Sequence, residues 1–191
     1  MRLFVALDLP DDVRRALGDL IGRLKKLCRE ARWVRPEATH LTLKFIGHAI
    51  RDDDAAKFAS LRAALAAIRS DRAAEMQFRG VGFFPNARRP RVAWCGVEAS
   101  PNLAQMAAEI EAALEPLGIP RESREFVPHL TLARFESPKG LAALTHAAEE
   151  LKSFDIGSAR ATEFYLYESV LHRSGAEYKK LETYPFVKEP A

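Results

Sequence analysis

The sequence has few cysteines and little net charge. Only two of its 191 residues are cysteines, Cys28 and Cys95, and they form neither a CxxC pair nor the dense pattern of a small secreted protein. We therefore expect free thiols in a reducing compartment. The 29 Lys and Arg residues exceed the 26 Asp and Glu residues by only three, far from the basic excess of a dedicated nucleic-acid-binding domain. Any anion specificity must come from a local site.

Long hydrophobic runs are also missing. No segment reaches the roughly 18 uninterrupted apolar residues of a membrane span, and the apolar run at residues 2–9 is too short for a signal peptide. We expect a cytoplasmic protein without a membrane partner. With 10 glycines and 11 prolines the chain is not collagen-like, and its 48% of hydrophobic residues exclude extensive disorder.

Hydrophobic periodicity predicts a mixture of helices and strands. Period-two alternation or buried apolar runs predict strands, and three- and four-residue spacing predicts helices. Because the strands are short and follow one another like hairpins, we expect an α+β protein with largely antiparallel sheets. The expected strands are 2–9, 39–47, 76–84, 91–98, 129–135, 161–171 and 177–185, and the expected helices are 11–29, 52–70, 101–117 and 140–151.

The order of these elements repeats. Helix starts at Asp11 and Pro101 are 90 positions apart, and His40 and His129 are 89 apart. This spacing predicts a duplicated helix-strand-helix-strand-strand unit, approximately 11–98 and 101–186, with the strand at 2–9 as an added piece. We expect a single two-lobed domain over residues 1–191. Its two largely antiparallel sheets, flanked by helices, would be related by a pseudo-two-fold axis around a central cleft.

One tetrapeptide occurs in both units. His-Leu-Thr-Leu stands at 40–43 and again at 129–132, each time at the start of an expected strand. Because strand side chains alternate, His40 and Thr42 share one face, as do His129 and Thr131, while the leucines point away. If the two strands meet, the site holds two imidazoles and two hydroxyls.

This set of groups suits a phosphodiester substrate. A neutral imidazole can take a proton from water while a protonated one gives a proton to the leaving oxygen, and no metal is needed. The hydroxyls of Thr42 and Thr131 and the guanidinium of Arg134 can hold phosphate oxygens. Strict alternation, however, places Arg134 on the face opposite to His129. It reaches the site only if the strand bulges or ends there.

The paired motifs resemble the two HxTx signatures of the 2H phosphoesterase superfamily. The resemblance to the bacterial RNA 2′,3′-cyclic phosphodiesterase family, also described as 2′-5′ RNA ligase, extends over nearly the whole chain. It rests on residues 2–7, 40–47, 128–134 and 166–169, with Gly175 and Tyr178. The resemblance implies a bilobal α+β fold and metal-independent hydrolysis of an RNA 2′,3′-cyclic phosphate to a 2′-phosphate.

The resemblance also implies the role of each site residue. His40 would be the proton donor to the departing 3′ oxygen and His129 the proton acceptor that activates water. Thr42, Thr131 and Arg134 would bind the phosphate. It implies no cofactor and no metal, with RNA ends or small cyclic nucleotides as partners. A 5′-hydroxyl in place of water would give 2′-5′ ligation, and a monomer is the default expectation.

Other interpretations of the same residues stay open. A zinc site could use His40 with His48, although no HExxH motif accompanies them. The substrate could be another cyclic or 2′-5′ linked nucleotide, or the chain could be a noncatalytic module that binds RNA ends. Aromatic residues could stack on bases, the candidates being Phe4, Trp33, Phe84 and Trp94.

Overall fold

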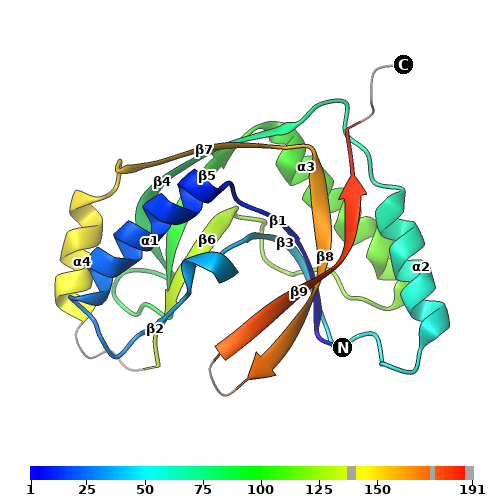
Figure 1. Ribbon diagram of the computed structural model, residues 1–191, viewed down its shortest axis with the longest axis horizontal. Coiled ribbons are helices and arrows are strands. Elements are labelled where there is room, and N and C mark those ends of the chain that lie inside the picture. Colours follow the sequence, from blue (N-terminus) through cyan, green and yellow to red (C-terminus); the bar gives the residue numbers. More distant parts are fainter. Residues whose placement is uncertain (137–140, 173–174, 188–191) are drawn as a thin grey trace.

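The computed structural model describes residues 1–136, 141–172 and 175–187 (Figure 1). Within them the helices are α1 (Asp11–Lys25), α2 (Ala55–Ala66), α3 (Pro101–Leu114) and α4 (Leu141–Glu150), with short 3-10 helices η1 (Pro36–Ala38) and η2 (Glu115–Leu117). The strands are β1 (Leu3–Leu7), β2 (Arg32–Trp33), β3 (Leu41–Gly47), β4 (Ala74–Phe84), β5 (Val92–Ala99), β6 (His129–Arg134), β7 (Asp155–Ala161), β8 (Glu163–His172) and β9 (Gly175–Pro185).

All the expected helices and strands are present, with shifted ends. Helix α1 buries an apolar stripe and ends at Lys25, before the expected end at residue 29. Helix α2 begins after Asp54, whose carboxylate accepts a hydrogen bond from the Lys57 amide at 2.9 Å and so acts as the N-cap. The expected start of the fourth helix, Gly140, lies outside the described residues.

The strands form one curved sheet in the order β7-β4-β5-β6-β3-β1-β8-β9, with β2 paired to the side of β6. Every pair of these strands is antiparallel, so the expected α+β class is confirmed. The two expected sheets are the two halves of this order. The two halves are joined through a single residue pair between β3 and β6, Leu41 with Leu130, and therefore form one continuous sheet.

Strands β1 and β5 occupy equivalent places in the two halves. β1 lies between β3 and β8, while β5 lies between β6 and β4. β1 also precedes α1 as β5 precedes α3. In the sheet, the strand at 2–9 thus takes the place in its half that β5 takes in the other half. The single two-lobed domain and its repeat boundaries stay a prediction.

The helices cover one face of the sheet. Helices α1 and α4 pack against β7 and β4, while α3 packs against β3 and α2 (Figure 1). The side chains of β1 alternate between the two faces of the sheet. Leu3, Val5 and Leu7 belong to the main core under the helices, whereas Phe4 and Ala6 form a small cluster with Tyr167 on the other face. The face without helices remains available to a ligand.

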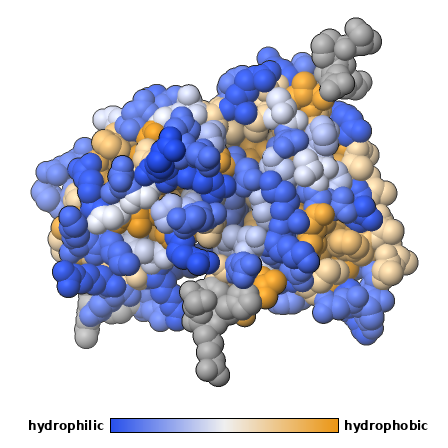
Figure 2. Space-filling view, viewed as in Figure 1, coloured by the Kyte–Doolittle hydropathy of each residue, from blue (hydrophilic) through white to orange (hydrophobic). Residues whose placement is uncertain are grey.

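The face of the molecule seen in Figure 2 is mixed and mostly polar. Figure 2 shows hydrophilic side chains over most of the viewed face, with apolar patches scattered among them. Cys28 and Cys95 are both buried, and neither forms a disulfide within the described residues. None of the helices in the described ranges has the length and apolarity that crossing a membrane requires.

Candidate active site

The two His-Leu-Thr-Leu segments lie side by side at the centre of the sheet. Strands β3 and β6 pair antiparallel at Leu41 and Leu130, and both leucines are fully buried. The residues on either side of each leucine must therefore face the other way. Extending the register by one residue sets His40 opposite Thr131 and Thr42 opposite His129. We call the surface formed by His40, Thr42, His129 and Thr131 the histidine face.

Both imidazoles are oriented by the same kind of hydrogen bond. Nδ1 of His40 lies 2.9 Å from the Ala38 carbonyl oxygen, and Nδ1 of His129 lies 2.8 Å from that of Val127. A carbonyl only accepts, so Nδ1 must carry the proton in each neutral ring. Nε2 then has a free lone pair in both residues and is the atom able to take up or release a proton.

Aromatic rings hold both histidines. His40 stacks on Phe4 with ring centroids 4.6 Å apart and meets the edge of Tyr178 at 4.9 Å. His129 meets Phe84 edge to face at 4.9 Å, and Phe84 in turn contacts Trp94. Such contacts restrict the rotamers of the imidazoles. Phe4 and Phe84, two of the base-stacking candidates, thus lie directly against the histidines.

Burial keeps both histidines neutral. Burial lowers the pKa of His40 to about 4, although the hydrogen bond to Ala38 and the charge of Asp8 act in the opposite direction. Burial also lowers the pKa of His129, opposed by the Val127 carbonyl and reinforced by the charge of Arg134. In the free protein near pH 7, both rings are therefore unprotonated at Nε2.

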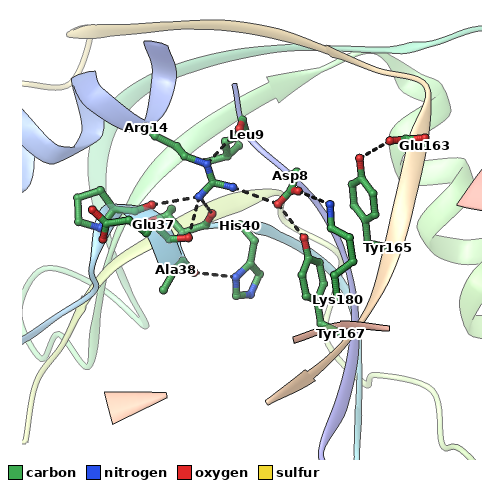
Figure 3. Close-up of polar contacts among 12 residues, drawn as sticks. Asp8, Leu9, Arg14, Glu37, Ala38, His40, Glu163, Tyr165, Tyr167 and Lys180 are labelled. Atoms are coloured by element: carbon green, nitrogen blue, oxygen red, sulfur yellow. Dashed lines mark hydrogen bonds and ion pairs between the residues drawn. The ribbon is translucent and has the colours of Figure 1, made fainter. Parts of the chain in front are cut away.

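A charged network lies next to His40 (Figure 3). Asp8 accepts hydrogen bonds from Tyr167 at 2.8 Å, Arg14 at 3.0 Å and Lys180 at 2.8 Å. Burial alone would raise the pKa of Asp8, but the bonds from Lys180 and Tyr167 and the charges of Lys180 and Arg14 lower it below its usual value. Asp8 is therefore a carboxylate across the neutral pH range.

A bulge in β6 places Arg134 on the histidine face. The β5–β6 register shifts between Ala93 and Trp94: Thr131 pairs with Trp94, but Ala133 pairs with Ala93. The extra residue lets Leu132 and Ala133 both point into the core. Alternation then resumes with Arg134 on the side of Thr131. The conflict with strict alternation is resolved by this local irregularity.

Strand β3 has a matching bulge. Val5 pairs with Lys44 and Ala6 with Thr42, so one residue of β3 is extra. As a result Lys44 turns away from the histidine face, where alternation would put it, and its ammonium binds Glu111 of α3 and the Pro120 carbonyl. Phe45, 57% exposed, takes the position on the histidine face that corresponds to Arg134 in β6.

The two threonine hydroxyls are available to a ligand. Thr42 and Thr131 are partly exposed, and within the described ranges neither hydroxyl has a hydrogen-bond partner. Other candidates lie elsewhere: His48 is exposed beyond the end of β3, and the Trp33 indole donates to the Cys28 carbonyl while packing on the main core. Across the described residues no three His, Cys, Asp or Glu side chains are grouped as ligands of one metal ion.

Comparison with known proteins identifies the family. The sequence model of the 2′-5′ RNA ligase superfamily matches residues 9–173. The chain belongs to this superfamily. A relative from Methanothermobacter thermautotrophicus named RNA 2′,3′-cyclic phosphodiesterase is 31% identical over 96% of this chain and 98% of its own length. A relative of the same name from Aeropyrum pernix is 35% identical over 85% of this chain and 94% of its own length.

Several solved structures have a similar fold. A protein of Thermus thermophilus superposes with a TM-score of 0.78 and 30% identity over the whole of both chains. Escherichia coli LigT complexed with 3′-AMP superposes with a TM-score of 0.74 and 26% identity over 98% of both chains. The expected resemblance to the 2H phosphoesterases is confirmed.

Sequence reasoning missed the network around Asp8. Asp8 follows a buried strand and Arg14 lies in the first turn of a helix, and neither belongs to a recognisable motif. Tyr167, which contacts both Asp8 and Phe4, entered only as part of the family resemblance. The available signal was weak: an acidic residue directly after a buried strand that runs beside the histidine strand.

Proposed function

We propose that this chain hydrolyses the 2′,3′-cyclic phosphate at an RNA end to a 2′-phosphomonoester, with two imidazoles and without a metal ion. The observation that carries the proposal is the pairing of Leu41 with Leu130, because it sets both His-Thr pairs on one face. The relatives named RNA 2′,3′-cyclic phosphodiesterase support this substrate class. With a 5′-hydroxyl in place of water, the same groups would catalyse 2′-5′ ligation.

In the proposed reaction the two histidines act from opposite sides of the phosphorus. Nε2 of His129 takes a proton from water as the water oxygen forms a bond to phosphorus. The bond from phosphorus to the 3′ oxygen breaks, and Nε2 of His40 gives its proton to that oxygen. Exchange with solvent then restores both rings. The Nδ1–carbonyl bonds support these roles because they leave Nε2 of each ring facing the ligand.

The lowered pKa of His40 is compatible with a proton donor once the substrate is bound. A phosphodiester carries one negative charge, which favours the protonated ring. At about 4 Å and an effective dielectric constant of about 20, the attraction is about 4 kcal/mol. That energy raises a pKa by about 3, which brings the pKa of His40 close to the neutral pH range. The ring can then be protonated when the substrate is bound. Substrate binding would thus supply the protonated donor.

The remaining groups would bind the phosphate. Thr42 and Thr131 can each donate a hydroxyl proton to a nonbridging oxygen, and each lies across the strand pair from a histidine. Arg134 is brought to the same face by the bulge in β6 and can stabilise the charge that develops in the transition state. We expect Arg134→Gln to weaken catalysis without abolishing it, since the threonines remain.

The decisive assay offers purified protein an RNA with a 2′,3′-cyclic phosphate end in the presence of EDTA. We expect turnover to a 2′-phosphate, while His40→Ala and His129→Ala lose activity by at least about 100-fold and still fold. Loss of wild-type turnover with EDTA would contradict the metal-free mechanism. Turnover of nucleoside cyclic phosphates alone would favour a small-nucleotide substrate, and binding without turnover would favour a noncatalytic module.

A second substrate separates the two histidine roles. A 3′-deoxynucleoside 2′-(p-nitrophenyl) phosphate keeps phosphorus on the 2′ oxygen and has a leaving group that needs no proton, so it bypasses a general acid. His40→Ala should lose much less activity on this ester than on the cyclic phosphate, whereas His129→Ala should lose activity on both. The reverse pattern would exchange the two assignments.

A further inference from the structure

Arg14 makes an unusual set of contacts for a residue in the first turn of a helix. Its guanidinium donates to Asp8 and to four backbone carbonyls, at 3.0 to 3.2 Å. These carbonyls belong to Leu9, just after β1, and to three residues in or next to η1, which are Pro36, Glu37 and Thr39. The side chain is only 20% exposed. One planar cation therefore ties the end of β1 to the turn that precedes β3 (Figure 3).

That turn contains the hydrogen-bond partner of His40. Ala38, whose carbonyl accepts from Nδ1 of His40, lies between Glu37 and Thr39, two of the residues that Arg14 holds. The position of the Ala38 carbonyl decides which nitrogen of His40 carries the proton. Arg14 thus acts on the imidazole through the backbone of η1, in addition to the direct effect of its charge, which lowers the pKa of His40.

Asp8 connects Arg14 to the other side of the imidazole. The same carboxylate oxygen that accepts from Arg14 accepts from the Tyr167 hydroxyl. The Tyr167 ring stacks on Phe4 at 5.2 Å, and Phe4 stacks on His40 at 4.6 Å. Arg14 and Asp8 together therefore fix both the hydrogen-bond partner of His40 and the aromatic ring on which His40 stacks.

His129 has no comparable support. Its partner carbonyl belongs to Val127, in a stretch where residues 121–125 and Val127 are exposed. Within the part of the chain that the structure describes, no side chain donates to the carbonyls of residues 125–128 apart from His129 itself. Arg124, the nearest cation in the sequence, pairs instead with Glu122. The two imidazoles, alike in their Nδ1 bonds, differ in how firmly those bonds are held.

We propose that Arg14 and Asp8 are positioning residues that hold His40 as the Nδ1-protonated tautomer, with Nε2 directed at the phosphate. The consequence for catalysis rests on the proposed function, but the tautomer itself does not. Lysine at position 14 would keep the charge and lose the planar fork that binds several carbonyls at once. Asparagine at position 8 would keep the size and lose the charge that pairs with Arg14.

The test measures the His40 ring directly. Nitrogen-15 spectra of the imidazoles, recorded above pH 7, distinguish the two neutral tautomers in wild type, Arg14→Lys and Asp8→Asn. We expect His40 to be Nδ1-protonated in wild type and a mixture of tautomers in both variants, with His129 unchanged. On the cyclic phosphate we expect kcat to fall by about 10- to 100-fold, while KM stays within about twofold. Arg160→Lys, which alters an exposed ion pair with Glu75, should match wild type.

Each result of these measurements either supports or overturns the positioning role of Arg14 and Asp8. An unchanged His40 tautomer in both variants overturns the proposal, as does an equal disturbance of His40 and His129, which would indicate general loosening. If Arg14→Lys does not fold, Asp8→Asn carries the test alone. Wild-type protein that fails to turn over the cyclic phosphate, with His40 still disturbed in the variants, would remove the proposed function and leave the positioning role intact.

Discussion

The two imidazoles of the histidine face share a backbone hydrogen bond but not an environment. His40 lies between Phe4 and Tyr178 and near the Asp8 carboxylate, while His129 has Phe84 on one side and Arg134 nearby. A nearby anion favours a protonated ring and a nearby cation disfavours it. At His40 the charge of Arg14 acts against that of Asp8, whereas at His129 the charges of Arg134 and Arg124 both lower the pKa. The Asp8 carboxylate thus favours His40 as the proton donor, and the bound phosphate has to offset the burial that lowers the pKa of His40 to about 4.

These environments predict the pH dependence of catalysis. Burial lowers the pKa of both histidines below the ordinary value of about 6.5, that of His40 to about 4. Since kcat/KM reports the free enzyme, and the reaction needs one ring protonated and one neutral, we expect a bell-shaped profile with its maximum below pH 6.5. Initial rates between pH 3.5 and 9 check this. A maximum above pH 7 would contradict it.

The histidines and threonines were predictable from the sequence, and their supporting residues were not. Alternation along a strand is a local rule, so the sequence alone assigns His40 and Thr42 to one face. No local rule connects Asp8 with Arg14 or either with Tyr167. Their contact depends on which strands pair, and β1 pairs with both β3 and β8.

At the level of single elements, the bulges changed what alternation predicts. In β3 the alternating pattern places Lys44 beside His40, but a buried ammonium needs a partner, and the bulge turns it to Glu111. In β6 the bulge lets two consecutive apolar residues, Leu132 and Ala133, enter the core. The sequence shows both features as breaks in the pattern, although it does not tell which residue is extra.

Strand β7 was missed for a related reason. Its sequence, Asp-Ile-Gly-Ser-Ala-Arg-Ala, contains one large apolar residue, Ile156, and no alternation. It forms because its backbone pairs with the edge of β4 over residues 74–79 and because α1 packs against it. An edge strand stabilised by its neighbours leaves little signal in its own side chains.

The contact between β4 and β5 next to His129 depends on a glycine. Gly82 pairs with Trp94, and a Cβ built at residue 82 would lie 2.3 Å from ring atoms of that indole. Trp94 contacts Phe84, which contacts His129. The absent side chain therefore allows the indole to lie flat on β4 and to support the ring beside the histidine.

Gly82→Ala should displace the Trp94 ring. We expect a loss of about 1–3 kcal/mol in the free energy of unfolding, measured with urea, because overpacking forces side chains from their rotamers. We also expect a fall of several-fold in kcat/KM on the cyclic phosphate, since Phe84 loses its neighbour. Gly22→Ala is the control: nothing lies within 4 Å of its Cβ, so in helix α1 it should be neutral or stabilising. Equal effects of the two variants would contradict the packing argument.

At the scale of the whole molecule, neither half of the sequence builds half of the sheet. The half of the sheet that contains β3, from the first part of the sequence, also contains β8 and β9 from its last part. The half of the sheet that contains β6 also contains β4 and β5. The repeat in the sequence could predict that two similar units exist. It could not predict this exchange, because the choice of strand neighbours depends on tertiary packing. The site forms only where the two halves meet, at Leu41 and Leu130.

Because the histidines lie on that junction, their protonation is coupled to folding. Burial lowers the pKa of His40 to about 4 in the folded protein, against about 6.5 in the unfolded chain. Below pH 6.5 the unfolded chain takes up a proton that the folded protein accepts only near pH 4. Stability is therefore full above pH 6.5 and falls between pH 6.5 and 4, by roughly 3 kcal/mol from this residue. His129 acts in the same direction.

His40→Asn should flatten this dependence. Asparagine is polar, close to the ring in size and does not titrate, so the burial of a proton-binding group is removed. We expect wild-type protein to lose about 3 kcal/mol more than the variant in its free energy of unfolding between pH 7 and pH 4, measured by urea denaturation at each pH. His146→Asn, with its side chain 80% exposed on α4, should follow the wild type. Parallel curves for wild type and His40→Asn would mean that His40 takes up a proton as readily in the folded protein as in the unfolded chain. The donor would then need no help from the substrate anion.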